Sequence, residues 1–166
     1  FDTYCQELQS NALSLFVRTA NGRGAVGMNR EKWVLNPNAT SRTELEMLAF
    51  VGKLMGIAIR SKEYLALNIP SIIWKLLAGD QPLLEDLEAV DVSIVNSLKK
   101  VVDAEGTDAE NFSYVYCLTY TTMSSDLREI ELIPGGAEKE VTYETRADYR
   151  DRVIQYRLHE FDRQAA

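Results

Sequence analysis

The feature that most constrains this chain is an apolar run at residues 47–59, MLAFVGKLMGIAI. A membrane-spanning helix needs about 20 consecutive apolar residues, and this run has thirteen with Lys53 in its middle. Its apolar side chains fall on nearly every face of a helix, which predicts a helix surrounded by protein. Gly52 and Gly56 lie one turn apart, so we expect another element to pack closely there. Leu at either position should then overpack, with a loss of about 1–3 kcal/mol.

The segments around this run predict a mixed fold that is dominated by helices. Ser41 and Glu44 have the spacing of a capping box, which begins the buried central helix, and Thr145 with Asp148 can cap the last helix. Apolar spacing predicts further helices at 1–9, 71–78 (between Pro70 and Gly79), 83–90 and 92–102. The aromatic and β-branched segment 114–122 predicts a strand, with 127–132 as its partner and 13–17 as a further short strand. We therefore predict an α+β fold, predominantly helical, with a small antiparallel sheet.

Charge and composition argue against several classes of function. A net charge of −7 is unfavourable for a protein that binds nucleic acid, which needs clustered Lys and Arg. Two cysteines and one histidine are too few for a zinc site, and we expect no metal and no cofactor. Neither a secretory signal nor a disulfide framework is predicted, so we expect a reducing compartment, the cytoplasm, with the nucleus as a second location. No contact with a membrane is expected.

The sharpest local motif is Gly-x-Gly-x-x-Gly at residues 22–27. One interpretation is a dinucleotide site, in which a helix N-terminus holds a pyrophosphate. That motif requires a strand, a helix and a second strand, whereas the next regular element here is the capped helix after Ser41. We therefore favour a flexible loop over a cofactor site, and saturable NAD or ATP binding that Gly24→Val abolishes would reverse that preference.

The side chains that could carry catalysis are few. Cys5 lies on an apolar helical stripe and Cys117 lies within the predicted strand 114–122, so both are interpreted as structural core residues. His159 stands near the end of the last helix, where a histidine is more often a helix-terminal cation than a base. Four acidic residues spread around their helices and are interpreted as a solvated face: Glu85, Asp86, Glu88 and Asp91. We predict no catalytic residue in this chain.

Six segments carry a family resemblance: LNPNA (35–39), GKLMGIAIR (52–60), LEDLEAVD (84–91), IELIPGG (130–136), VTYETRADY (141–149) and YRLHEFDRQ (156–164). In order and spacing they resemble the HECT-type ubiquitin ligase domain. The opening YCQELQS and the segment YRLHEFDRQ are most similar to its HERC branch. The resemblance covers essentially the whole chain.

The resemblance implies a fold, an activity and a set of partners. Residues 1–166 are expected to be a partial HECT domain, the large subdomain of its N-terminal lobe, without the subdomain that docks the conjugating enzyme and without the catalytic C-terminal lobe. The family accepts ubiquitin as a thioester from a ubiquitin-conjugating enzyme and transfers it to a lysine of a protein substrate. Cys5 and Cys117 match structural positions, so this piece is expected to be an inactive platform. Some HECT ligases hold a second ubiquitin on this lobe through exposed aromatic residues. The stretch SNALSLF lacks aromatic residues before Phe16, so the sequence does not decide whether such a site exists here.

Two rival functions remain beside this interpretation. The first is a non-enzymatic protein-interaction module that keeps a HECT-like fold without its chemistry. The second is the nucleotide-binding enzyme already described. The substrate, the cognate conjugating enzyme, the ubiquitin linkage and the other domains of the parent are not predicted by the sequence.

Overall fold

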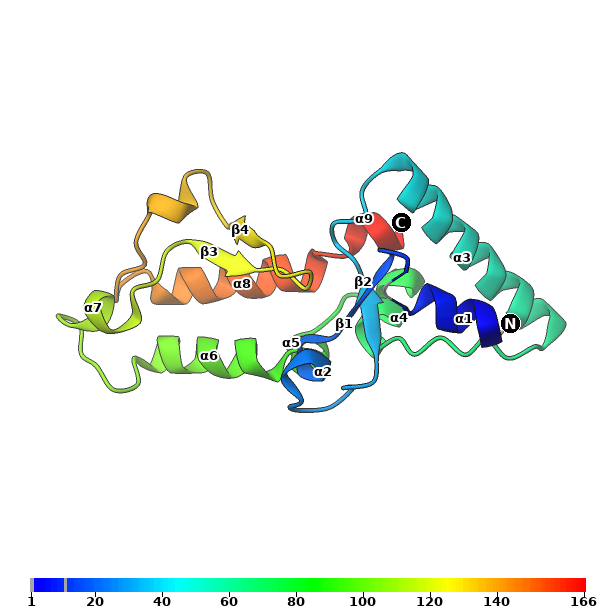
Figure 1. Ribbon diagram of the computed structural model, residues 1–166. Helices are drawn as coiled ribbons and strands as arrows, with labels where there is room; N and C mark the ends of the chain where they lie inside the picture. Colours follow the sequence, from blue (N-terminus) through cyan, green and yellow to red (C-terminus); the bar gives the residue numbers. More distant parts are fainter. Residues whose placement is uncertain (1, 11) are drawn as a thin grey trace.

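The computed structural model describes residues 2–10 and 12–166 (Figure 1). Phe1, the first residue of the helix predicted at 1–9, lies outside the described residues. The elements are α1 (Asp2–Leu8), β1 (Phe16–Arg18), α2 (Ala20–Gly24), β2 (Trp33–Leu35), α3 (Arg42–Ser61), α4 (Ser71–Ala78), α5 (Leu84–Glu88), α6 (Val92–Asp103), α7 (Phe112–Tyr116), β3 (Thr121–Met123), β4 (Glu129–Glu131), the short 3-10 helix η1 (Gly136–Glu138), α8 (Arg146–His159) and α9 (Asp162–Ala165). About half of these residues are helical, which confirms the predicted fold class.

The strands form two separate antiparallel pairs. In the first, β1 pairs with β2, with Val17 opposite Val34. In the second, β3 pairs with β4, with Thr122 opposite Ile130. The chain turns after β4 through Gly135, whose positive φ of 72° is a conformation that glycine adopts without a steric penalty.

Two hydrophobic clusters divide the described chain into two halves. The first cluster gathers buried side chains from β1, β2, α3, α4 and α5, from Val95 near the start of α6 and from Phe161 beyond α8. The second lies between α6, α7, β3 and α8. We call the part with α1 to α5, β1, β2 and α9 the inner half, and the part with α6 to α8, β3 and β4 the outer half. In Figure 1 the outer half extends to the left as α6 and α8, which contact each other along their length, and α7 lies at its tip.

The helix α3 begins and ends as its sequence predicts, but its burial is not what we expected. The capping box between Ser41 and Glu44 is present. Only one stripe of the helix, with Leu48, Val51 and Ala58, is buried. The expectation of a helix surrounded by protein is therefore wrong for the described chain, in which apolar residues on the other faces meet solvent (Phe50 is 58% exposed, Ile57 53% and Ile59 78%).

The surface of α3 at Gly52 and Gly56 is also uncovered among the described residues. A Cβ atom added at Gly52 or Gly56 would meet no heavy atom within 4 Å. The expectation of an element packed closely on these glycines is therefore wrong for the described residues, and Gly52 instead lines an open groove. No helix among the described residues is both long enough and apolar enough to cross a membrane.

The segment 114–122 is a helix at its start, where we predicted a strand. Residues 112–116 form α7, and only Thr121–Met123 form a strand. The physical reason is that Phe112 and Tyr116 lie four residues apart, so a helix places both rings on one face, with centroids 4.8 Å apart. The ring of Tyr143 meets Phe112 edge-on and completes this small aromatic core.

Two predicted helix starts differ in detail. Pro70 is the N-cap of α4 rather than its first residue, while Gly79 ends the helix with a φ of 77°, as a C-terminal glycine should. Thr145 is the N-cap of α8 but makes no capping hydrogen bond. Its hydroxyl instead accepts from the backbone N–H of Thr142, and Asp148 pairs with Arg152.

Candidate functional site

The two cysteines occupy very different places. Cys5 is buried in α1, as predicted. Cys117 is exposed, which corrects the prediction of a buried strand residue: it ends α7 in a left-handed conformation, with a φ of 46°. Its thiol donates a hydrogen bond to the carbonyl oxygen of Tyr114, at 3.1 Å.

His159 lies in the last turn of α8, where the sequence places it. Its Nδ1 is 3.0 Å from a carboxylate oxygen of Asp162, one turn further along the chain. A histidine at a helix C-terminus that faces a carboxylate is placed to complement the helix dipole. The prediction that His159 is a helix-terminal residue agrees with this placement.

The Gly-x-Gly-x-x-Gly segment is filled by the protein itself. A Cβ at Gly22 would lie 2.3 Å from the carbonyl oxygen of Arg30, so the glycine permits a close approach of two backbone segments. Gly27 has a φ of 65° and faces the side chains of Asn21 and Val92. Part of the segment is the helix α2 rather than a flexible loop, and these glycines serve internal packing rather than a phosphate.

Two of the four acidic residues that we assigned to a solvated face are buried. Glu85 is exposed and Glu88 partly so, but Asp86 and Asp91 are in the core. Each caps the start of a helix: Asp86 accepts from the backbone N–H of Leu83, and Asp91 accepts from that of Ile94. Helix starts leave N–H groups without partners, and a buried carboxylate can satisfy them.

Asp86 is the centre of a polar cluster between α4 and α5. One oxygen accepts from Lys75 Nζ at 2.7 Å and from the backbone N–H of Leu83 at 2.8 Å. The other accepts from the hydroxyl of Ser71 at 3.1 Å. Burial of the carboxyl opposes its ionisation, but these donors outweigh burial and lower the pKa of Asp86. The cluster holds α4 against α5.

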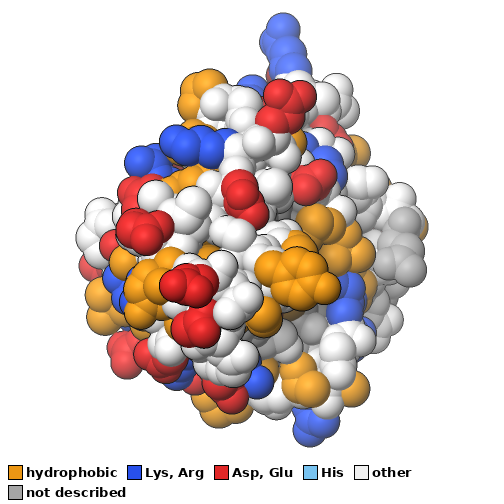
Figure 2. All heavy atoms as spheres, turned by 90° about the vertical axis from the view of Figure 1, so that its left-hand side faces the viewer, with side chains coloured by type: hydrophobic (Ala, Val, Ile, Leu, Met, Phe, Trp, Pro, Cys, Tyr) orange, Lys and Arg blue, Asp and Glu red, His pale blue; other side chains and the backbone are white. Residues whose placement is uncertain are grey.

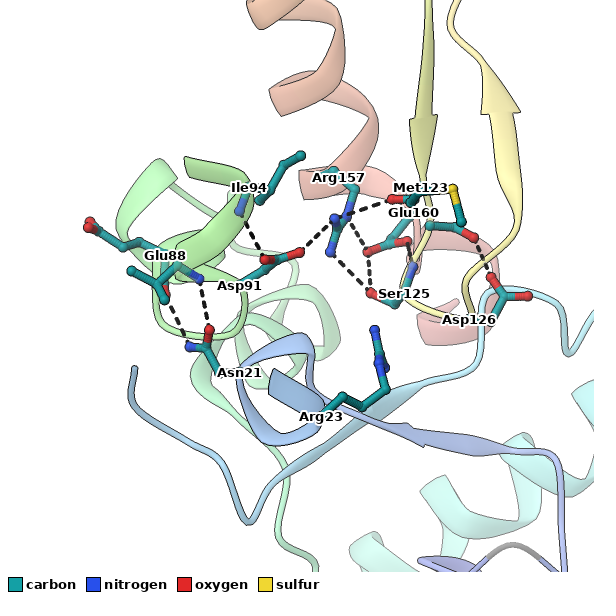
Figure 3. A network of polar contacts seen from close by, with 12 residues as sticks. Asn21, Arg23, Glu88, Asp91, Ile94, Met123, Ser125, Asp126, Arg157 and Glu160 are labelled. Carbon is teal, nitrogen blue, oxygen red and sulfur yellow. Dashed lines mark hydrogen bonds and ion pairs between the residues drawn. The ribbon is translucent and has the colours of Figure 1, made fainter. Parts of the chain in front are cut away.

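A second polar cluster surrounds Arg157 of α8, whose side chain is 3% exposed (Figure 3). Its Nη1 donates to a carboxylate oxygen of Asp91 at 2.9 Å and to the carbonyl oxygen of Met123 at 3.3 Å, and its Nε donates to Glu160 at 3.0 Å. Ser125, in the turn between β3 and β4, donates to Glu160 through both its N–H (3.0 Å) and its hydroxyl (2.6 Å). Burial disfavours the charged guanidinium, but the carboxylates of Glu160 and Asp91 outweigh burial and raise the pKa of Arg157.

Arg23 of α2 approaches the same cluster from the inner half. Figure 3 shows its side chain pointing toward Ser125 and Arg157. Although Arg23 is exposed on one side, its partial burial is the largest influence on the guanidinium and lowers its pKa, while the carboxylate of Asp91 opposes that effect. A guanidinium beside two buried carboxylates and one buried cation balances the charge of this region.

Two features of the described surface stand out, an open groove and an exposed apolar tip. The groove has a volume of about 580 Å³, lies between α3, α4 and α9, and is lined in part by Leu45, Gly52 and Leu77. The tip is α7, where Tyr114 is 86% exposed beside the half-exposed Val115. Figure 2 looks onto this end of the molecule and shows hydrophobic side chains interspersed with Asp and Glu.

Within residues 2–10 and 12–166, no group of three or more His, Cys, Asp or Glu side chains is placed to hold a metal ion. The polar clusters around Asp86 and Arg157 are closed by their own partners and join structural elements. Both clusters hold helices in place, and the one around Arg157 also holds the β3–β4 hairpin.

Comparison with known proteins identifies the family. The sequence matches the family described as HECT-domain (ubiquitin-transferase) over residues 2–166. The chain belongs to the HECT-domain family. Its relatives include E3 ubiquitin-protein ligase HERC2 of Mus musculus, 38% identical over 162 residues that cover 98% of this chain and 3% of that protein. The HERC2 of Homo sapiens has the same identity and coverage.

A more distant relative extends the family match. Probable E3 ubiquitin-protein ligase HECTD4 of Homo sapiens is 30% identical over 175 residues, which cover 94% of this chain and 4% of that protein. The HERC branch that the segment YRLHEFDRQ suggested is confirmed by the HERC2 similarity. The chain spans about 3% of the length of those HERC2 relatives.

The cluster around Arg157 was not predicted from the sequence, although a signal for it exists. Val153, Arg157 and Phe161 follow one another at four-residue spacing, and the first and third are fully buried. A helix places such residues on one face, so an Arg between two core positions must itself be buried. Buried arginines are paired with carboxylates, and in the structure these are Asp91 and Glu160.

Proposed function

We propose that this chain is the large subdomain of the N-terminal lobe of a HECT ubiquitin ligase and acts as a platform for ubiquitin transfer. The observation that carries the proposal is the match to the HECT-domain family along residues 2–166. In this proposal the parent protein accepts ubiquitin from a ubiquitin-conjugating enzyme as a thioester. It then transfers the ubiquitin to a lysine of a protein substrate, in the cytoplasm or the nucleus. The thioester cysteine and the subdomain that docks the conjugating enzyme belong to parts of the parent outside residues 1–166.

The places of the two cysteines support this assignment. A nucleophilic thiol must be deprotonated, which requires a neighbouring base, a cation or a helix N-terminus. Cys117 lies at the C-terminal end of α7, where the helix dipole is negative, and its thiol proton is held by the Tyr114 carbonyl. Cys5 is buried in α1. Because one thiol is buried and the other lies at the C-terminal end of a helix, we assign both cysteines to the scaffold.

A platform contributes to transfer by position. Holding two reacting groups at a fixed distance and angle raises their effective concentration. The two hydrophobic clusters and the polar clusters around Asp86 and Arg157 give the chain internal order that such a role needs. The proposed partners are the conjugating enzyme, ubiquitin and protein substrates.

The test is thioester formation, followed on a non-reducing gel. Ubiquitin-charged conjugating enzymes are mixed with residues 1–166 and, separately, with the complete HECT domain of the parent. We expect a thiol-sensitive ubiquitin adduct on the complete domain, and the same adduct when that domain carries Cys117→Ser or Cys5→Ser. Residues 1–166 alone should form none.

Two outcomes would overturn parts of this proposal. An adduct on residues 1–166 that disappears with Cys117→Ser would make the exposed thiol a reactive residue. Absence of an adduct on the complete domain, across a broad panel of conjugating enzymes, would instead favour a non-enzymatic interaction module with a HECT-like fold.

A further inference from the structure

The two hydrophobic clusters meet at a polar position. The partly buried side chain of Ile94 packs against both clusters. On α8 and just beyond it, Val153 belongs to the cluster of the outer half and Phe161 to that of the inner half. Arg157 lies midway between them on the same helical face. The core is therefore interrupted, where its two parts join, by a charged side chain that is 3% exposed.

The partners of Arg157 stand at the points where the helices and the hairpin of this junction meet. Asp91 stands at the corner between α5 and α6, and Ser125 stands in the turn of the β3–β4 hairpin. Glu160 lies where α8 gives way to α9 of the inner half. Arg157 donates to Asp91 and Glu160, its Nη2 lies 3.4 Å from the Ser125 hydroxyl, and Glu160 accepts two bonds from Ser125.

We propose that Arg157, Asp91, Glu160 and Ser125 form a joint that holds the inner and outer halves in one relative orientation. We call these four residues the Arg157 joint. Apolar contacts are non-directional, so the contacts of Ile94, Val95 and Leu158 with the inner cluster do not by themselves fix the angle between the halves. A guanidinium is planar and donates in fixed directions, so its bonds to the start of α6, to the end of its own helix and to the β3–β4 turn oppose rotation at the junction. Rotation would also leave a buried carboxylate without its cation, which is strongly unfavourable.

The joint has a consequence for the platform, and this consequence rests on the proposed function. The outer half carries α7 at its tip, far along α6 and α8 from the inner half (Figure 1). A small rotation at the junction therefore displaces the tip by a large distance. Fixing the junction fixes where the whole outer half lies relative to the inner half, and with it any partner that either half holds.

The test measures the distance between the halves with spin labels on residues 1–166. One label is attached to the exposed Cys117 on α7, and the other to an Asp80→Cys substitution just after α4 in the inner half. The chain without the second substitution is labelled in parallel to count the thiols that react. We compare Arg157→Lys and Asp91→Asn with the matched control Arg152→Lys, whose arginine is on the same helix but pairs with Asp148 within it.

We expect the distance distribution to become roughly twofold wider in Arg157→Lys and in Asp91→Asn, as in a released hinge, and to stay unchanged in Arg152→Lys. Asp91→Asn removes the ion pair while its amide oxygen can still accept from the Ile94 N–H, so α6 keeps its cap. If Arg157→Lys does not fold, Asp91→Asn alone tests whether the joint fixes the orientation of the halves. An unchanged distribution in folded Asp91→Asn would overturn the proposal. Because no ubiquitin is present, this result is independent of whether the parent transfers ubiquitin.

Discussion

The buried carboxylate of Asp86 gives the chain a stability that depends on pH. Burial opposes its ionisation, but the donors Lys75, Leu83 and Ser71 outweigh burial and lower its pKa. A carboxyl whose pKa is lower in the folded state stabilises the fold above its unfolded pKa of about 3.9, and this stabilisation is lost as pH falls through the folded pKa. Asp86→Asn should therefore lower the free energy of unfolding by about 2 kcal/mol at neutral pH.

Urea unfolding over a series of pH values checks this prediction. The difference between Asp86→Asn and the unsubstituted chain should shrink as the pH falls below about 4, because the native carboxylate then takes up a proton. The exposed neighbour provides the control: Glu85→Gln should change the free energy of unfolding by less than about 0.5 kcal/mol throughout. A difference for Asp86→Asn that stays constant with pH would show that its charge is not what stabilises the cluster.

Two glycines of one motif should respond differently to substitution by alanine. At Gly22 an added Cβ would lie 2.3 Å from the backbone carbonyl of Arg30, and the backbone must shift to admit it. At Gly24 the nearest atom is a methyl carbon of Val26 at 3.5 Å, an ordinary contact. Gly22→Ala should lower the free energy of unfolding by about 1–3 kcal/mol through overpacking. Thermal unfolding is the measurement, and Gly24→Ala is expected to melt close to the unsubstituted chain; equal losses in both variants would contradict the packing explanation.

Among the elements, α3 yields a prediction opposite to the one its sequence suggests. Gly52 and Gly56 have open space where a Cβ would stand, so a side chain there removes backbone freedom from the unfolded chain without a clash. Gly52→Ala and Gly56→Ala should each raise the free energy of unfolding by about 0.5–1 kcal/mol. Gly79 is the control, because it has equal space but a φ of 77°, and Gly79→Ala should destabilise the chain. Destabilisation by Gly52→Ala would mean that another element packs on this face of α3.

The same elements show what can be inferred from sequence. The capping box at Ser41 is local, because two side chains and two backbone groups three residues apart decide it, and it was predicted correctly. The burial of α3 is not local: apolar residues on every face predict a covering of protein, but the described chain supplies partners for one stripe only. The strand prediction for 114–122 was wrong for a different reason. The contacts of Phe112 with Tyr116 and Tyr143 favour a helix there and outweigh the strand propensity of the segment.

The candidate site was harder to predict than the fold. The sequence indicated correctly that Cys5 is buried, but it could not show that Cys117 would emerge at the end of a helix rather than within a strand. Asp91 and Arg157 are 66 residues apart, and only the packing of α6 on α8 brings them together. Spacing along one helix marks Arg157 as buried, whereas the identity of its partners depends on the tertiary fold.

For the whole molecule, the Arg157 joint predicts that two separate clusters unfold as one unit. Val153 of the outer cluster is fully buried, and Val153→Ala removes two methyl groups' worth of packing, with an expected loss of about 2 kcal/mol. If the joint couples the halves, this loss should accelerate the slowest-exchanging amides of β1 and β2 in the inner half as much as those of α8. Val34→Ala, at an equally buried inner position, should act in the reverse direction.

Native-state hydrogen exchange, measured by peptide mass spectrometry, shows whether the two clusters unfold as one unit or as two. Cooperative units exchange with one free energy, whereas independent units keep separate ones. In the unsubstituted background both valine variants should lower the exchange free energy of both halves by the same amount. In an Asp91→Asn background the halves lose their ion pair, so Val153→Ala should then affect the outer half alone. If Val153→Ala lowers the exchange free energy of the outer half alone even without Asp91→Asn, the two clusters unfold separately. The joint would then orient the halves without coupling their stability.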